Sequence, residues 1–189
     1  MTQVDHADLD ETVDVPDPMQ HQDGQAPDGR WLDDGQQRAW RAFLLGSSRL
    51  NDALNRQLEA EAGMSLSEYE VLVRLSESPQ RTLRMSELAA ELVFSRSRLT
   101  HTVRRMEDRS LVERRTCRDD GRGVNCVLTD TGFATLQQTA PGHVDAVRRH
   151  MVDLLTTDQL RALGEAMAIV AQGPSPQAPA AAGSGTPTP

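Results

Sequence analysis

Two short predicted helices with a very short link between them restrict the fold of this chain more than any other feature. The first covers 85–92, and the second begins after an N-cap at Ser95 and reaches about Arg109. The apolar residues of the second helix recur at i, i+4 and i+7, the spacing of one buried helical face, and they are Leu99, Val103 and Met106. This arrangement is typical of a helix-turn-helix.

Two β-prone runs follow the second helix directly. They cover 111–117 and 124–128, and a polar turn with two glycines separates them. A β-hairpin immediately behind a helix-turn-helix is a wing. The spacing therefore predicts a winged helix-turn-helix.

Longer helices are predicted on both sides of this module. A capping box at Asp34 and Gln37 opens a helix that ends at Gly63, and a second box at Ser67 and Glu70 opens a short helix to Leu75. Thr129 caps a helix that continues past a kink at 141–142, and a box at 156–159 opens the last helix. The end helices are long and carry apolar stripes that a single chain leaves partly exposed.

The expected fold class is mainly α with a small β-hairpin wing, a winged helix-turn-helix domain flanked by long N- and C-terminal dimerisation helices. The folded domain is expected over 31–172, with the helix-turn-helix and wing at about 66–129. The dimerisation helices are expected at about 35–62 and 130–172. Residues 1–30 are predicted to be a disordered acidic arm and residues 173–189 a disordered tail, because both are poor in apolar residues.

The net charge of −8, averaged over the whole chain, argues against a nucleic-acid partner. The charge is, however, distributed unevenly along the sequence. Residues 1–30 hold eight acidic residues and one basic residue, a net of −7, whereas 95–118 hold eight arginines and three acids, a net of +5. Within 95–105 there are four arginines and no acid. One hypothesis is that the acidic arm competes with phosphates for this basic face. Deleting 1–30 tests it through non-specific DNA affinity at low salt.

No apolar run approaches the roughly 18 residues of a membrane span, and the N-terminal residues include no hydrophobic segment. We therefore expect no membrane partner and a cytoplasmic location. The two cysteines are expected to be reduced there.

The motifs in this order resemble the MarR family of bacterial winged helix-turn-helix regulators. They are LSEYEVL at 66–72, SELA at 86–89, the segment 95–107, LVER at 111–114, and a wing pattern from Asp120 through Arg122 to the LTDTG of 128–132. Cys126 stands where the family pattern has valine. The resemblance covers about 35–172. It implies a homodimer whose terminal helices interlock, a palindromic operator, and DNA release by a small, often phenolic or anionic, ligand.

The predicted DNA-contacting residues lie on the face of the second helix opposite its apolar stripe and on the wing. Base contacts are assigned to Ser97, Thr100 and His101, with Arg98 and Arg104 as guanine readers. Phosphate contacts are assigned to Ser95, Arg96 and Arg105. On the wing, Arg118 and Arg122 are assigned to DNA, and the resemblance places Arg122 at the minor groove with Asp120 as its support. The alternative is a solvated helix face.

Other features support weaker hypotheses. Trp40, Phe43, Ser47 and Tyr69 either line an effector pocket or belong to the core. Cys117 and Cys126 either form a thiol switch or are ordinary strand residues. His143 and His150 lie seven residues apart, but without a tight ligand cluster a metal site is the less favoured interpretation. No cofactor is expected, and the sequence shows no arrangement of catalytic residues, so we expect no enzyme activity.

The sequence therefore predicts a sequence-specific, DNA-binding transcriptional regulator. The favoured form is a ligand-responsive repressor that binds a palindromic operator in double-stranded DNA as a homodimer. The alternatives are a DNA-binding activator or nucleoid-type protein without a small ligand, and a protein-interaction module.

Overall fold

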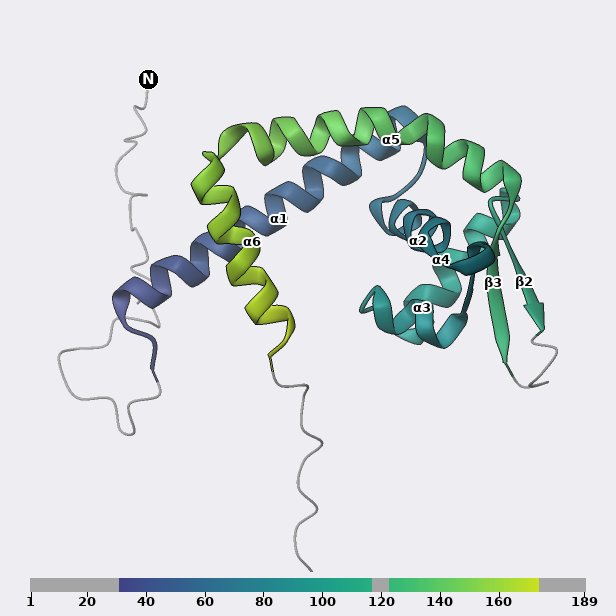
Figure 1. The fold of residues 1–189 in the computed structure, drawn as a ribbon, viewed down its shortest axis with the longest axis horizontal. Helices are drawn as coiled ribbons and strands as arrows, with labels where there is room; N and C mark the ends of the chain where they lie inside the picture. The colour runs from purple at the N-terminus through teal and green to yellow at the C-terminus, as the bar shows by residue number, and fades with distance from the viewer. Residues whose placement is uncertain (1–30, 117–122, 174–189) are drawn as a thin grey trace, which may run out of the picture. The chain divides into compact units, whose positions relative to one another are not determined.

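The computed structural model describes residues 31–116 and 123–173. The elements in chain order are α1 (Asp34–Ala62), α2 (Leu66–Glu77), the 3₁₀ turn η1 (Pro79–Arg81), β1 (Thr82–Arg84), α3 (Met85–Glu91), α4 (Arg96–Asp108), β2 (Val112–Thr116), β3 (Val124–Leu128), α5 (Asp130–His150), the 3₁₀ turn η2 (Val152–Leu154) and α6 (Thr157–Ala171) (Figure 1). The predicted acidic arm, the turn of the wing and nearly all of the predicted tail lie outside the described residues.

The chain divides into two units, Met1–Ala42 and Phe43–Pro189. The described part of the first unit is the start of α1 and the three residues before it, and all other elements belong to the second unit. Among the described residues, no helix combines the length and hydropathy that a membrane span requires.

The sheet has three antiparallel strands in the order β1-β3-β2. β2 pairs with β3 along its whole length, so that Arg114 lies opposite Cys126, and β1 pairs with the other edge of β3. The winged helix-turn-helix prediction is confirmed, but the wing has one strand more than the predicted hairpin. β1 is only three residues long, too short for an alternating pattern to be visible in the sequence.

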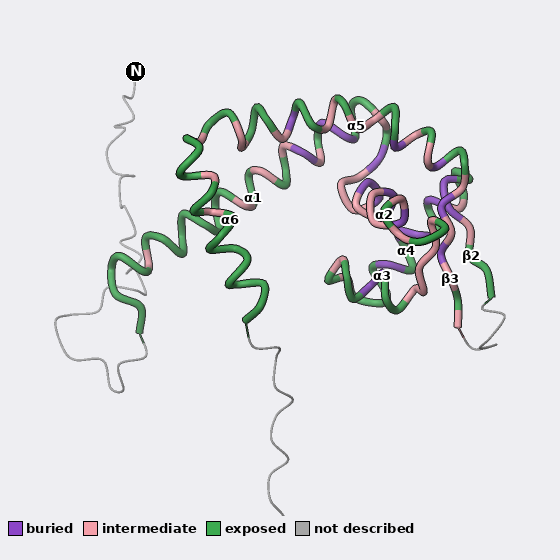
Figure 2. Tube along the Cα trace, viewed as in Figure 1, coloured by how far each residue is buried: buried purple, intermediate pink, exposed green. Residues whose placement is uncertain are grey.

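The hydrophobic core lies where α2, α3 and α4 pack against the sheet and the start of α5. Figure 2 shows the buried residues concentrated in these elements, whereas α6 has no buried residue. The apolar stripe predicted for the second helix of the helix-turn-helix is confirmed, because Leu99, Val103 and Met106 on α4 are all buried. The core includes Leu58, Val71, Leu72, Leu75, Leu88, Leu111, Val112 and Leu128.

Two of the predicted capping boxes lie at shifted positions. At α1 the reciprocal bonds join Asp33 and Gln36, one residue before the predicted pair. At α2 they join Ser65 and Glu68, two residues before the predicted pair, so the helix begins at Leu66 and extends to Glu77. The sequence holds two overlapping S-x-x-E patterns here. The earlier one is used because Gly63 ends α1 in the left-handed conformation (φ 59°) and leaves Ser65 as the first available cap.

The predicted N-caps of three later helices agree with the structure. Ser95 caps α4, Thr129 caps α5, and Thr156 forms a capping box with Gln159 at α6. The helix predicted after Thr129 continues through Pro141 but ends at His150, and the 3₁₀ turn Val152–Leu154 follows it, whereas the apolar spacing carries that helix to Leu154.

The LTDTG motif makes the junction between the sheet and α5. The Thr129 hydroxyl donates to the carbonyl oxygens of Ser110 (2.7 Å) and Leu111 (3.0 Å), and it accepts from the Gly132 amide (2.9 Å). A side chain at Gly132 has no room, because a Cβ built there would overlap the Leu111 carbonyl oxygen and lie 2.7 Å from Leu128 Cδ1. The glycine therefore permits the close approach of α5 to the chain entering β2.

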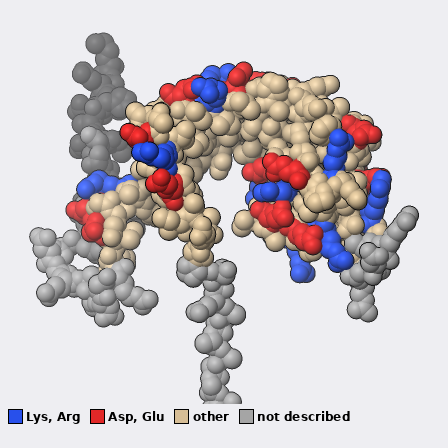
Figure 3. Space-filling model, in the orientation of Figure 1, with Lys and Arg blue, Asp and Glu red and all other residues tan. Residues whose placement is uncertain are grey.

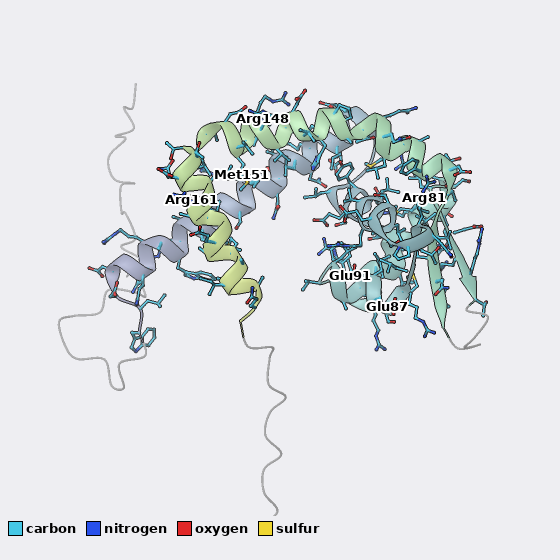
Figure 4. The ribbon with its side chains drawn as sticks, in the orientation of Figure 1. Arg81, Glu87, Glu91, Arg148, Met151 and Arg161 are labelled. Atoms are coloured by element: carbon cyan, nitrogen blue, oxygen red, sulfur yellow. The ribbon has the colours of Figure 1, made fainter. Side chains whose placement is uncertain are left out.

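A second junction joins the turn before β1 to the same helix. Arg81 has a left-handed backbone (φ 54°), and its guanidinium lies 3.6 Å from the centre of the Phe133 ring. It also pairs with Asp130 at 3.2 Å, in the first turn of α5. Figure 4 shows Arg81 beside the start of this helix. These contacts hold a strained turn against α5.

Val93, in the turn between α3 and α4, has an unfavourable backbone. Its φ is 53° and its side chain is 87% exposed, so a β-branched residue occupies the left-handed region without burial to compensate. Val93→Gly should raise the free energy of unfolding by about 0.5–1 kcal/mol. Relieving the left-handed backbone of a residue with a Cβ gains roughly 1–2 kcal/mol. The conformational entropy of glycine offsets about 0.5–1 kcal/mol of that gain.

Urea unfolding at one fixed protein concentration measures this change. Val124→Gly, at an exposed valine in β3, is the matched control and should lower stability because glycine weakens a strand. A fall in the stability of Val93→Gly would contradict the strain assignment.

Candidate nucleic-acid interface

α4 presents its polar side to solvent. On its opposite side, Thr102 is buried together with the apolar stripe. At the start of the helix, the Ser95 hydroxyl accepts a hydrogen bond from the Arg98 amide (3.2 Å). All eight residues predicted to contact DNA from this segment are exposed: Ser95, Arg96, Ser97, Arg98, Thr100, His101, Arg104 and Arg105. Figure 3 shows arginines projecting from the lower edge of the winged-helix domain, with acidic residues above them.

Two of the four arginines are held by α2. Arg98 donates to the Ser67 hydroxyl at 2.6 Å, and its guanidinium lies 3.9 Å from the centre of the Phe94 ring. Arg105 Nε donates to Glu68 Oε1 at 3.2 Å. Within the described residues Arg104 has no such partner. The four arginines therefore divide into two that α2 restrains, Arg98 and Arg105, and two, Arg96 and Arg104, without such a partner among the described residues. Helical spacing does not reveal this distinction.

Arg96 and Thr100 border a pocket of about 290 Å³ between α4, α3 and the beginning of β3. Its lining is Arg84, Met85, Ser86, Arg96, Leu99, Thr100, Gly123 and Val124. The Thr100 hydroxyl donates to the Arg96 carbonyl at 2.8 Å, so its hydrogen is committed to the helix. Its oxygen still has acceptor capacity. The pocket gives this edge of α4 a basic and polar rim.

A fork of charged hydrogen bonds joins the end of α4 to the wing. Glu107 accepts from the backbone amide of Arg114 (2.9 Å) and from its Nε (2.8 Å), and Arg114 Nη2 lies 2.6 Å from the same carboxylate. These bonds raise the pKa of the Arg114 guanidinium above its ordinary value. Arg118, Arg122 and Asp120, predicted to act on the wing turn, lie outside the described residues.

Sequence reasoning missed the residues that hold α4 in place. They are Ser67, Glu68, Glu107, Arg109 and Arg114. The capping-box pattern at Ser65 was the available signal for Glu68, but nothing local indicated its arginine partners.

Cys126 lies in the middle of the sheet and is fully buried. Burial, reinforced by the nearby Glu107 carboxylate, raises the pKa of its thiol to about 12 although Arg114 opposes the rise. A reactive thiol needs a lowered pKa and access to solvent. The environment of Cys126 therefore disfavours the thiol-switch hypothesis at this residue, and Cys117 lies outside the described residues.

Cys126 should accordingly resist alkylation in the native protein. In a Cys117→Ser variant, iodoacetamide at pH 8 should leave the native chain unmodified, because the thiol stays protonated far below a pKa of about 12. The same variant in urea should be modified fully and serves as the control. Rapid modification of the native variant would contradict the burial.

The four predicted effector residues differ in environment. Trp40 and Phe43 are exposed on α1, and the Ser47 hydroxyl donates to the carbonyl of Phe43 (2.7 Å). Tyr69 is buried, and its ring centre lies 4.3 Å from that of His143. Burial raises the pKa of Tyr69 and lowers that of His143.

A second pocket, of about 280 Å³, lies between the end of α1 and α5. Its lining is Glu61, Ala62, Thr135, Gln138, Thr139 and Gly142, which includes none of the four predicted effector residues. Next to it, His143 Nδ1 lies 3.3 Å from Gln57 Oε1, and Gln57 donates to Glu61 (2.7 Å). No group of three potential metal ligands occurs among residues 31–116 and 123–173.

A helix-turn-helix with an exposed basic second helix, backed by a three-stranded wing sheet, defines a winged helix-turn-helix protein. A sequence model described as the MarR family matches residues 62–123. Among solved structures, the chain is similar to Sco3205, a MarR family transcriptional regulator from Streptomyces coelicolor solved in complex with DNA. The two are 47% identical with a TM-score of 0.75, over 81% of this chain and 96% of that one.

AbsC, a MarR family transcriptional regulator from the same organism, is 43% identical with a TM-score of 0.71, over 76% of this chain and 96% of that one. MepR from S. aureus, solved as a DNA complex, shares the fold at 17% identity with a TM-score of 0.62, over 70% of this chain and 96% of that one. A search of curated proteins returned no match. The identity and coverage show that the chain belongs to the MarR family, whose members are transcriptional regulators and not enzymes.

Proposed function

We propose that this regulator binds a palindromic operator in double-stranded DNA as a homodimer and represses transcription until an effector releases it. The observation that carries the DNA-binding part is the outward face of α4, where Arg96, Ser97, His101 and Arg104 are exposed and no acid occurs within 95–105. A helix of this kind enters the major groove with its first turns at the base edges. Sco3205, which is 47% identical to this chain, was solved in complex with DNA.

The proposed contacts follow the accessibility of the side chains. Arg104 is unrestrained and suits a guanine, with Ser97 and His101 beside it on the same face. Arg98 and Arg105 are already restrained by α2 and lose less conformational entropy when they meet DNA. Ser95 and Arg96 are proposed to contact phosphates and Thr100 a base edge, while Arg118 and Arg122 extend the contact through the wing with support from Asp120.

A homodimer is supported by apolar side chains that the single chain leaves in water. α6 has no buried residue, and Ile169 and Val170 on it are 73% and 67% exposed. Phe43, Leu44 and Leu45 on α1 are exposed as well. A second copy that covers both sets removes this apolar surface from solvent and supplies the two-fold symmetry that a palindrome requires.

Binding to duplex fragments at several salt concentrations tests the DNA-binding proposal and separates the alternatives. We expect the logarithm of the association constant to fall with the logarithm of salt concentration by about 0.9 per phosphate contact. No binding at low salt would favour a protein-interaction module, and binding without sequence preference would favour a nucleoid-type protein. A reporter that falls when the regulator is removed would indicate an activator.

Effector control is supported by the 280 Å³ pocket between α1 and α5, which is close to the size of a small-ligand site. The resemblance to the family implies a phenolic or anionic ligand. The Glu61 carboxylate at this pocket favours a phenol, which can donate a hydrogen bond, over a benzoate. Thermal-shift measurements with matched phenols and benzoates test this. Stabilisation by benzoates alone would place the effector elsewhere, where Trp40, Phe43, Ser47 and Tyr69 remain the predicted residues.

A further inference from the structure

Hydrogen bonds from the side chain that follows α4 join this helix to the end of α1. Arg109, the residue that follows α4, donates to the carbonyl oxygens of Gly63 (2.9 Å) and Ala62 (3.4 Å). These carbonyls belong to the C-terminal end of α1, where the final turn leaves its acceptors without partners in the helix. A guanidinium at this end is favoured both by the hydrogen bonds and by the helix dipole.

Glu68 completes the junction from the side of α2. Its side chain is only 7% exposed, and its Oε2 accepts from the backbone amide of Ser65 (2.8 Å) and lies 4.0 Å from Arg109 Nη1. Its Oε1 accepts from Arg105 Nε (3.2 Å). A carboxylate this deeply buried needs charged partners, and Arg105 on α4 and Arg109 directly after it supply them.

A third contact fixes α1 to the start of α2. Asn55, on α1, accepts from the backbone amide of Leu66 at 2.9 Å. α1 and α2 are therefore joined independently of α4, and Arg109 connects α4 to the carbonyls at the point where the two helices meet. Because Arg109 binds backbone atoms, α4 cannot slide along α1 without breaking both bonds.

We infer that Arg109 is a positioning residue that sets where the recognition helix stands relative to the dimer-forming helix α1, and thereby sets the separation of the two DNA half-sites. The inference rests on the proposed function. In a two-fold dimer, two α4 helices reach successive major grooves only if they lie about one helical turn of DNA apart. Arg109 links the end of α4 directly to α1, whereas Arg105 bonds to Glu68 on α2.

The test compares affinities for four duplexes: one half-site, the palindrome with its natural spacing, and two palindromes with one base pair added or removed at the centre. One added base pair moves the half-sites apart by about 3.4 Å and rotates them. Arg109→Met keeps most of the side-chain volume but cannot donate hydrogen bonds. We expect it to bind the half-site within threefold of wild type, to bind the natural palindrome at least tenfold more weakly, and to discriminate between spacings at least tenfold less.

Arg74→Met is the matched control. Arg74 bridges Glu77 on α2 and Glu91 on α3, and its side chain is 43% exposed against 38% for Arg109. Because these two ion pairs lie on α2 and α3, their loss leaves the junction between α4 and α1 intact, and this variant should keep the wild-type preference for spacing. A general loss of stability would lower binding to every duplex together, whereas a positioning defect changes the ratio between spacings.

Arg109→Leu, which also lacks a hydrogen-bond donor, provides a second variant if Arg109→Met does not fold. Wild-type discrimination between spacings in either folded variant would overturn the inference. If the wild-type chain itself binds the palindrome no better than the half-site, the proposed dimeric function fails instead, and the two failures are distinguishable.

Discussion

Gly132→Ala is expected to unfold the winged-helix domain or leave it severely destabilised, by more than about 3 kcal/mol. The new Cβ would overlap the carbonyl oxygen of Leu111 and lie 2.9 Å from its carbonyl carbon. The neighbours are backbone atoms, which cannot move aside without displacing the entry to β2. The displacement would also strain the bonds that Thr129 makes to Ser110 and Leu111. Overpacking at less rigid sites already costs about 1–3 kcal/mol.

Circular dichroism and urea unfolding measure the effect of Gly132→Ala. Gly164→Ala is the control, because Gly164 lies inside α6 and a Cβ there meets nothing within 4 Å. Alanine in a helix interior is favoured over glycine by about 0.8–1 kcal/mol, so this variant should be as stable as wild type or more so. Wild-type stability of Gly132→Ala would show that α5 does not approach Leu111 closely.

The combined substitution of Arg98 and Arg104 by alanine is expected to weaken operator binding at least tenfold. Each arginine that makes a good base contact contributes about 1–3 kcal/mol of discrimination, and 1.4 kcal/mol corresponds to about tenfold. The single variants separate their roles. Arg104→Ala should mainly relax the sequence preference. Arg98→Ala also releases Ser67 on α2 and should additionally loosen the position of α4.

The control for this experiment removes two arginines elsewhere. Arg148 on α5 and Arg161 on α6, both labelled in Figure 4, are exposed. They pair with Asp153 and Asp158. Their combined substitution by alanine changes the net charge by the same amount away from α4. It should alter operator affinity by less than about threefold, because contacts that far away are screened by salt. Equal losses in the two double variants, with both still dimeric by gel filtration, would mean that total charge, not the face of α4, governs binding.

The sequence is most informative where structure is determined locally. The cap at Ser95 and the stripe of Leu99, Val103 and Met106 depend on residues within one helix, and both agree with the structure. The LTDTG motif is recognisable as a wing signature in the sequence, but its physical reason is not. That reason, the missing Cβ of Gly132 against the Leu111 backbone, appears only in three dimensions.

The predictions from sequence are wrong or incomplete where a structural feature depends on residues outside the local pattern. β1 forms because it pairs with β3, about forty residues later, and the three residues themselves give little indication of a strand. The sequence places the capping box at α2 two residues late because two overlapping patterns fit equally well. The partners of Arg98 and Arg109 lie 31 and 46 residues away, beyond the range of any helical pattern.

Selection of binding sites from a random duplex pool tests whether two copies of α4 read a two-fold-symmetric DNA site. We predict enrichment of two inverted half-sites whose centres lie about 10–10.5 base pairs apart, bound by two chains. Repeating the selection with Arg104→Ala should relax the sequence at one position in each half-site. Enrichment of a site without inverted symmetry, or of no sequence at all, would contradict the proposed dimeric recognition.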